Sequence, residues 1–145
     1  MSDKLELSKT WFKRVWAEED PAAIDEIFVP DVGDAAKGLG EKPLAGPSEF
    51  KEFHKSLLSH IKNVDIQVQR FAEDGDWLSV LCVLSARCRK TDKPVEVTGQ
   101  IWIRIDDGKF REAYNHFDFW GLFEQLGKIP SQSMDRCLAG ESFVT

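Results

Sequence analysis

Apolar side chains in the first part of the chain recur at the spacing of amphipathic helices. They stand three or four residues apart at Leu7, Trp11 and Val15, and again at Phe12 and Trp16. A helix with this spacing turns one apolar stripe toward a core and its polar side chains toward solvent. The pattern therefore predicts an N-terminal helix that includes these residues.

Two more helices are predicted before the strands begin. Asp20 is a favoured N-cap and Pro21 suits the first helical position, so a second helix is expected to start there. Gly46-Pro47 opens the third helix, whose apolar positions are Phe50, Phe53, Leu57, Leu58 and Ile61. Residues 29–47 hold four glycines and three prolines without periodicity. We expect a long irregular loop there, of the kind that often forms a lid or a binding wall.

The second half of the chain has the alternation of β-strands. Val64, Ile66 and Val68 alternate with polar residues, and the sequence E-D-G-D at residues 73–76 is typical of a hairpin turn. Two long strands are predicted over residues 77–89 and 95–105, joined by residues 90–94. A second turn at residues 106–108 leads into a strand over residues 109–118 and then a short helix. The sum is an α+β fold with a four-stranded antiparallel meander.

The two long strands are apolar on both faces. Leu81, Val83 and Trp102 lie opposite the face that carries their other apolar residues. A sheet that is buried on both sides needs a cover on each, and three helices can cover one. We therefore expect a homodimer in which a second copy of the chain packs against the sheet face.

Length and composition fit one globular domain. The chain has 145 residues, with 42% hydrophobic and 30% charged side chains, which suits one core rather than a disordered chain. We expect a single domain over residues 1–130 and a C-terminal tail over residues 131–145, where the apolar pattern is lost. The net charge of −6 argues against a nucleic-acid partner, which requires a basic face.

Membrane and secretory signals are also missing from the sequence. No segment approaches the ~20 apolar residues of a membrane span, and the charged N-terminus does not resemble a signal peptide. Cys82 and Cys88 on one predicted strand would be about 20 Å apart, at ~3.3 Å per residue, so they cannot form a disulfide. Reduced thiols are typical of a cytoplasmic protein.

Cofactor and metal motifs are not found. His54, His60 and His116 have no metal-ligand spacing, and the cysteines form no C-x-x-C pair. The chain has no glycine-rich dinucleotide motif and no phosphate-binding loop. We therefore expect no metal and no cofactor.

Asp118 is the first candidate for chemistry. It stands where the last strand gives way to the terminal helix, among Tyr114, Phe117, Phe119 and Trp120. An apolar setting disfavours the charged carboxylate and can make it a general base that removes a proton alpha to a carbonyl. The alternative is a structural N-cap for the helix that begins near Phe119.

The strand before Asp118 supplies further candidates. Alternation places His116 and Tyr114 on one face with Asp118, where they could act as proton carrier and hydrogen-bond donor. In the alternative, that row faces a dimer partner, and Asn115 and Phe117 line the cavity instead. Alternation alone does not say which face points inward.

Three other residues could contact a ligand. His54 lies in the apolar stripe of the third helix, where it is either a core histidine or part of a cavity wall. Arg87, near the end of an apolar strand, could anchor a substrate carboxylate or could simply be a solvated strand end. Trp102 is a further candidate for substrate contact on the central strands.

The chain resembles the SnoaL-like polyketide cyclase family over about residues 8–129. The resemblance rests on the order of elements and on the ending D-G-K-x-x-E…D-x-x-G-L-x-x-Q-L-G between Asp107 and Gly127. A Gly-Pro start followed by a phenylalanine-rich helix, at residues 46–53, also looks like the family. The family shares the cone-shaped fold of nuclear transport factor 2 and ketosteroid isomerase, in which a curved antiparallel sheet wraps around N-terminal helices.

The resemblance implies a small apolar carbonyl ligand in a conical cavity. In members that are enzymes, the aspartate of the D-x-x-G-L motif is the general acid/base of a ring closure, and here it is Asp118. Asn115 matches a polar position three residues earlier. The family often has a histidine in the strand over residues 77–89, whereas this chain has none and Arg87 stands nearest. The expected function is a cofactor-free cyclase or isomerase, with a non-catalytic binding or dimeric interaction module as the alternative.

Overall fold

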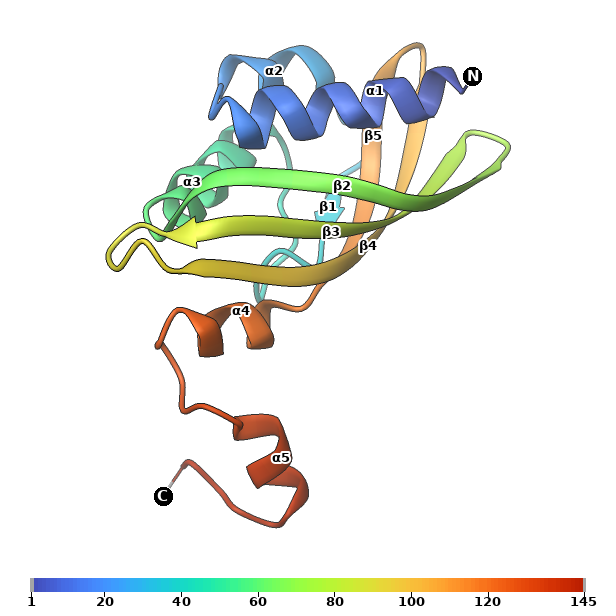
Figure 1. The fold of residues 1–145 in the computed structure, drawn as a ribbon. Helices are drawn as coiled ribbons and strands as arrows, with labels where there is room; N and C mark the ends of the chain where they lie inside the picture. Colours follow the sequence, from blue (N-terminus) through green and yellow to red (C-terminus); the bar gives the residue numbers. More distant parts are fainter. Residues whose placement is uncertain (1, 145) are drawn as a thin grey trace.

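A curved five-stranded sheet forms the centre of the computed structural model, which describes residues 2–144 (Figure 1). Its strands are β1 (Ala36–Lys37), β2 (Ile61–Asp74), β3 (Trp77–Cys88), β4 (Pro94–Asp106) and β5 (Lys109–Phe117). Their order in the sheet is β1-β5-β4-β3-β2. Strands β2 to β5 pair antiparallel as a meander, so the predicted α+β fold is confirmed.

The hairpin turns form where the sequence predicts them. Strand β2 ends and β3 begins on either side of Gly75 and Asp76, and Gly75 has a φ of +58°. Between β4 and β5, Asp107 and Gly108 both have positive φ, at 52° and 68°. Positive φ at both central positions matches the twist of the flanking strands, which is why Asp-Gly suits this turn.

The helices are α1 (Asp3–Trp11), η1 (Phe12–Ala17), α2 (Ala22–Ile27), α3 (Pro47–Leu58), α4 (Phe119–Gln125) and α5 (Ser133–Leu138). The predicted first helix is therefore present, but its second half, η1, is a π-helix. Helix α2 begins at Ala22, one position later than predicted. The carboxylate of Asp20 still accepts a hydrogen bond from the Ala22 amide at 3.0 Å.

The segment over residues 29–47 is more ordered than predicted. Strand β1 pairs in parallel with β5, and Ala36 also forms a bridge with Leu44. Two-residue strands leave no alternation in the sequence, so composition alone indicated a loop. The segment lies across the edge of β5 and extends the sheet at that side.

The C-terminal tail contains a helix that the sequence pattern does not reveal. Helix α5 is tethered at Ser133, whose hydroxyl accepts a hydrogen bond from Trp120 Nε1 at 2.6 Å and donates one to Glu124. Its apolar residues Met134 and Leu138 are 63% and 76% exposed. A helix that buries no apolar stripe shows no helical periodicity, which explains the missing signal.

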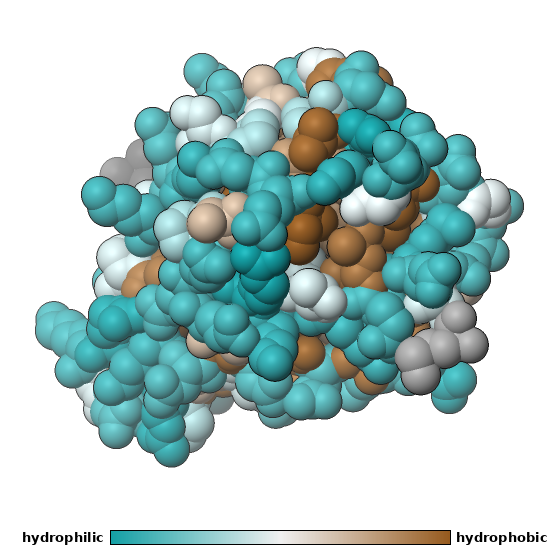
Figure 2. All heavy atoms as spheres, turned by 90° about the horizontal axis from the view of Figure 1, so that it is seen from above, coloured by the Kyte–Doolittle hydropathy of each residue, from teal (hydrophilic) through white to brown (hydrophobic). Residues whose placement is uncertain are grey.

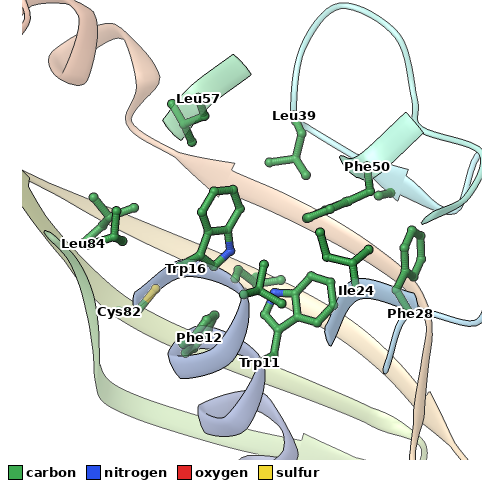
Figure 3. Close-up of a cluster of buried hydrophobic side chains, with 14 of the residues drawn as sticks. Trp11, Phe12, Trp16, Ile24, Phe28, Leu39, Phe50, Leu57, Cys82 and Leu84 are labelled. Carbon is green, nitrogen blue, oxygen red and sulfur yellow. The ribbon is translucent and has the colours of Figure 1, made fainter. Parts of the chain in front are cut away.

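The hydrophobic core lies between the N-terminal helices and the concave face of the sheet. Trp11, Phe12 and Trp16 project from α1 and η1 toward Phe50 of α3 and the sheet residue Leu84 (Figure 3). Seen from above, over α1 and α2, the surface is mostly hydrophilic, with apolar atoms visible near its middle (Figure 2). Some apolar atoms therefore remain visible on the face of the molecule that carries α1 and α2.

Candidate functional site

A cavity of about 60 Å³ lies inside the cone, between the helices and the concave sheet face. Twenty described residues line it, and nineteen of these are apolar. The exception is Asn115 of β5, so among the described residues no titratable side chain reaches the cavity wall. The space suits a small apolar group with one polar contact.

Aromatic rings form much of the cavity wall. Phe50 lies at the centre of the cluster, with ring centroids 5.2 Å from Trp11, 5.7 Å from Phe28 and 6.0 Å from Phe53, all near edge-to-face. Phe53 in turn meets Phe119 of α4 at 6.3 Å. Such pairs stabilise the wall beyond the area they bury, so the cavity is held open by packed rings rather than by loose side chains.

Segments α1 and η1 together supply three aromatic side chains of the cavity wall. Trp11, Phe12 and Trp16 all line the cavity, although they come from one continuous helical segment. A π-helix has i→i+5 hydrogen bonds and is frequent at functional sites. Here η1 packs against β2, the edge strand that would otherwise leave the cone open.

Asn115 is held in place from the loop side. Its Nδ2 donates a hydrogen bond to the Lys37 carbonyl at 2.9 Å, and its residue is 8% exposed. Gly38 lies so close that a Cβ atom there would be 1.8 Å from the Asn115 carbonyl oxygen. Because an amide nitrogen carries two hydrogens and the side-chain oxygen also accepts, this side chain has capacity left for a ligand.

The loop predicted as a lid or wall does contribute to the cavity. Ala36 and Leu39 line it, and Leu39 is 7% exposed. Gly38, between them, has a φ of +88°, which L side chains rarely adopt. The close approach and the backbone conformation both require glycine at this point.

Asp118 lies at the start of α4, outside the cavity lining. Its carboxylate accepts a hydrogen bond from the Gly121 amide at 2.8 Å, which is the N-cap arrangement that the sequence offered as the structural alternative. The residue is exposed. Its neighbours Phe117 and Phe119 both line the cavity, so the carboxylate stands at the boundary of the site.

The D-x-x-G-L motif has a local structural explanation. A Cβ atom at Gly121 would lie 2.4 Å from the Asp118 Oδ2 atom, so the capping carboxylate needs a glycine there. Leu122, the next residue, is 1% exposed and lines the cavity. The motif thus starts a helix and directs an apolar side chain into the cone.

Strand β5 shows which of its two faces points into the cone. Asn115 and Phe117 point into the cone, whereas Tyr114 and His116 lie on the outer face. There they border a shallow hollow together with Trp77, Trp102 and Asp74. The structure therefore does not bring His116, Tyr114 or Trp102 to the cavity, because alternate residues of a strand point to opposite faces.

The other two candidates are also outside the cavity lining. His54 is buried, and its Nε2 lies 2.6 Å from the Val15 carbonyl, in the last turn of η1 where carbonyls lack an intrahelical donor. Its ring lies 4.9 Å from that of Trp16. Arg87 is exposed and donates to the Asp92 carbonyl at 2.6 Å, so it forms a solvated strand end.

Charged and thiol groups near the cone have structural partners. Arg104 binds both Asp31 and Glu112, and the hydrogen bond from Arg104 lowers the pKa of the Asp31 carboxyl. Cys82 on the inner face of β3 is fully buried, and burial raises its pKa to about 11. Among the described residues, no three His, Cys, Asp or Glu side chains gather as a metal site would require.

Asn115 and Phe117, two of the candidates from the sequence, line the cavity, whereas most of its aromatic wall was not predicted as such. The spacing of Trp11, Phe12 and Trp16 predicts an apolar stripe that faces the core. The same stripe faces both the core and the cavity, because the apolar residues that line the cavity are also part of the hydrophobic core. The periodic aromatic content of the first helix was the available signal.

The sequence of the chain matches one protein family. A family model of the SnoaL-like domain matches residues 9–113. The match ends just before Asn115 and Asp118. A search of curated proteins finds no match.

Solved structures share the fold at low sequence identity. A proposed polyketide cyclase from Acidithiobacillus ferrooxidans is 20% identical, with a TM-score of 0.75 over 88% of this chain and 96% of that chain. A proposed SnoaL-like polyketide cyclase from Jannaschia sp. CCS1 is 16% identical, with a TM-score of 0.74 over 88% and 94%. A protein of ketosteroid isomerase-like fold from Catenulispora acidiphila, in complex with trimethylamine, is 16% identical, with a TM-score of 0.71 over 84% and 92%. At these identities the likeness shows the fold.

A membrane-spanning helix is not found among residues 2–144, where no helix combines sufficient length with sufficient apolar character.

Proposed function

The chain belongs to the SnoaL-like domain family, and we propose that it binds a small apolar carbonyl compound in its cone. The observation that carries the proposal is the cavity lining, which is apolar at nineteen of twenty described residues. Burial in such a space stabilises an apolar ligand by roughly 25 cal/mol per Å² of apolar surface removed from water. Affinity thus comes mainly from the rings of the wall.

Asn115 supports the carbonyl group in this proposal. Its Nδ2 already donates one hydrogen bond to Lys37, and the second hydrogen is available for a ligand oxygen. A buried hydrogen bond of this kind adds about 1 kcal/mol, or about fivefold in affinity. It would orient the ligand as well as retain it.

A matched pair of ligands tests this role. We expect 1-indanone to bind about fivefold more tightly than indane, measured by displacement of the neutral dye N-phenyl-1-naphthylamine. The difference should disappear in the variant Asn115→Leu, which keeps the side-chain size but has no amide. Circular dichroism checks that the variant is folded. Equal binding of the two compounds to the wild-type protein would contradict the role of Asn115.

A second candidate function is cofactor-free acid/base catalysis, in a cyclase or isomerase that uses Asp118. It is favoured by the position of Asp118 between Phe117 and Phe119, which both line the cavity. A general base must come within hydrogen-bond reach of the proton it removes, so the carboxylate would have to leave the Gly121 amide. His116 has no part in this version, because it lies on the outer face.

We also propose that a second copy of the chain covers the outer sheet face. Leu81 and Trp102 are 38% and 39% exposed there, and Trp77 packs against both Trp102 and Tyr114 at ring distances of 6.5 and 6.0 Å. The N-terminal helices pack on the inner face and leave this one without a cover. A two-fold pair would bring the same apolar strip from each copy together.

Sedimentation equilibrium tests the homodimer. The wild-type protein is expected to be dimeric at micromolar concentration, and Trp102→Glu should shift it toward monomer. Phe71→Glu is the matched control. Phe71 is also exposed, at 49%, but it lies opposite the inward-facing Val80, so its side chain is on the inner face of the sheet and not on the proposed dimer face. A wild-type monomer at micromolar concentration would remove the proposal.

A further inference from the structure

A groove of about 370 Å³ runs along the outside of the cone between the first helical segment and β2. Lys9 and Lys13 border it on the helix side, and residues 65–68 border it on the strand side. Strand β2 is the edge of the sheet, so this groove follows the seam where the helix closes the cone in place of a further strand.

The groove and the internal cavity share two walls. Phe12 of η1 and Ile66 of β2 line both of them. Phe12 is buried and Ile66 is half-buried, so the apolar interior and the groove lie on either side of the same two side chains. A ligand that reaches from one space into the other has to displace at least one of them.

The size of the cavity makes such a connection relevant. Its volume of about 60 Å³ is small beside the ~300–1,000 Å³ of typical ligand pockets. A ligand larger than a single small ring, such as 1-indanone or N-phenyl-1-naphthylamine, therefore has to extend beyond the cavity. The groove at the seam is the adjoining space that shares walls with it.

The charges of the groove indicate what the extending part would be. The chain as a whole has a net charge of −6, yet the groove is bordered by two lysines and by a single carboxylate, Asp65. Lys9 and Lys13 are four residues apart and so lie on the same helix face. Asp65 accepts a hydrogen bond from Gln67 at 2.8 Å.

Lys13 is not strongly held by another partner. Its Nζ lies 3.9 Å from Glu18, and the two side chains are 75% and 50% exposed. Ion pairs with this exposure contribute little, so the ammonium group can turn toward a ligand at small cost. No salt bridge of Lys9 occurs among the described residues.

We propose that this groove is a second subsite, in which Lys9 and Lys13 bind the anionic group of a ligand whose apolar body occupies the cone. The ligand class is then an apolar acid, such as a ring compound with a carboxylate side chain. The inference rests on the proposed function, because it requires the cone to hold the apolar part. Each ammonium group donates charge-assisted hydrogen bonds to the carboxylate oxygens.

Two dyes with the same ring system test the subsite. The anionic dye 8-anilinonaphthalene-1-sulfonate is N-phenyl-1-naphthylamine with an added sulfonate, so the pair differs only in the anionic group. The double variant Lys9→Gln/Lys13→Gln is expected to weaken binding of the sulfonate dye about fivefold and to leave the neutral dye within twofold. The loss should shrink as salt is raised from low ionic strength, because screening weakens exposed charge pairs.

Matched controls separate the subsite from net charge and from the cone. Lys42→Gln/Lys55→Gln removes the same charge from exposed positions elsewhere and should leave both dyes unchanged. Ala113→Phe fills the cavity from β5 and should abolish binding of both dyes; Ala36→Leu is used if that variant does not fold. Circular dichroism checks each variant.

The outcomes distinguish the two proposals. If neither dye binds the wild-type protein, the proposed function fails and the subsite with it. If both dyes bind but the Lys9/Lys13 variant changes neither, the subsite is overturned and the cone stands. Equal losses in the control lysine variant, or sulfonate-dye binding that survives a filled cavity, also overturn the subsite.

Discussion

Replacement of Asp118 by alanine or by asparagine tests what this carboxylate does. The carboxylate accepts the Gly121 amide hydrogen at 2.8 Å and begins helix α4. Alanine removes the acceptor altogether. Asparagine keeps a side-chain oxygen in the same place and is an equally good N-cap, but it has no negative charge and cannot act as a base.

The magnitude follows from the capping geometry. Loss of an N-cap acceptor costs about 1 kcal/mol of the free energy of unfolding. For 145 residues at about 2.1 cal/mol/K per residue, the unfolding entropy is about 0.3 kcal/mol/K, so the melting temperature should fall by about 3 °C in Asp118→Ala. Asp118→Asn should stay within about 1 °C of the wild-type protein.

Calorimetry and dye binding together decide the matter. If both variants have the melting temperature of the wild-type protein, the N-cap contributes nothing to stability and the structural explanation is wrong. If asparagine melts as low as alanine, the charge matters rather than the acceptor. Displacement of N-phenyl-1-naphthylamine by 1-indanone should be unchanged in Asp118→Asn when the carboxylate only caps. A loss there would place the carboxylate at the ligand and favour the catalytic hypothesis.

Three further predictions test the structure around the site. In calorimetry, Gly38→Ala should melt at a clearly lower temperature than Gly40→Ala. Both glycines have positive φ, but only at Gly38 would the added Cβ atom collide with backbone atoms. Equal melting temperatures would contradict the close contact. A thiol reagent at pH 8 should label the exposed Cys137 and leave Cys82 unlabelled, because burial raises the Cys82 pKa to about 11; rapid Cys82 labelling in mass spectrometry would mean an open core. Asp31→Asn should lower stability near pH 7 in denaturant titrations, and this loss should shrink as pH falls below the ordinary carboxyl value near 4. The hydrogen bond from Arg104 lowers the Asp31 pKa, so the contribution of Asp31 is present above the ordinary value and is lost as pH falls through the lower folded value.

Burial periodicity made most of the fold predictable. Strands β2 to β5 and helix α3 formed close to where alternation or a three-to-four spacing had placed them, because each buries one face against a common core. Ile61, predicted as an apolar position of the third helix, instead begins β2. Strand β1 and helix α5 bury too few residues to produce a periodic pattern of apolar residues in the sequence. The π-helix was also invisible, since an i→i+5 segment with the same apolar stripe has no composition of its own.

The site was only partly predictable, because alternation gives relative faces and not absolute ones. It correctly separated Tyr114 and His116 from Asn115 and Phe117, but it left open which pair points inward. The answer follows from the register with β4, in which Asn115 lies opposite the inward-facing Ile101 and Tyr114 lies opposite Trp102. The sequence of β5 alone does not contain that register.

The motif around Asp118 identifies a fold more securely than a chemistry. Asp118 caps α4, Gly121 leaves room for the carboxylate, and Leu122 enters the cavity, so each lettered position has a structural task. These tasks are the same whether the cone binds a ligand or transforms one. Function must therefore be inferred from what faces the ligand. In the described structure that is an aromatic wall with one amide, Asn115, and beyond it a seam bordered by two lysines.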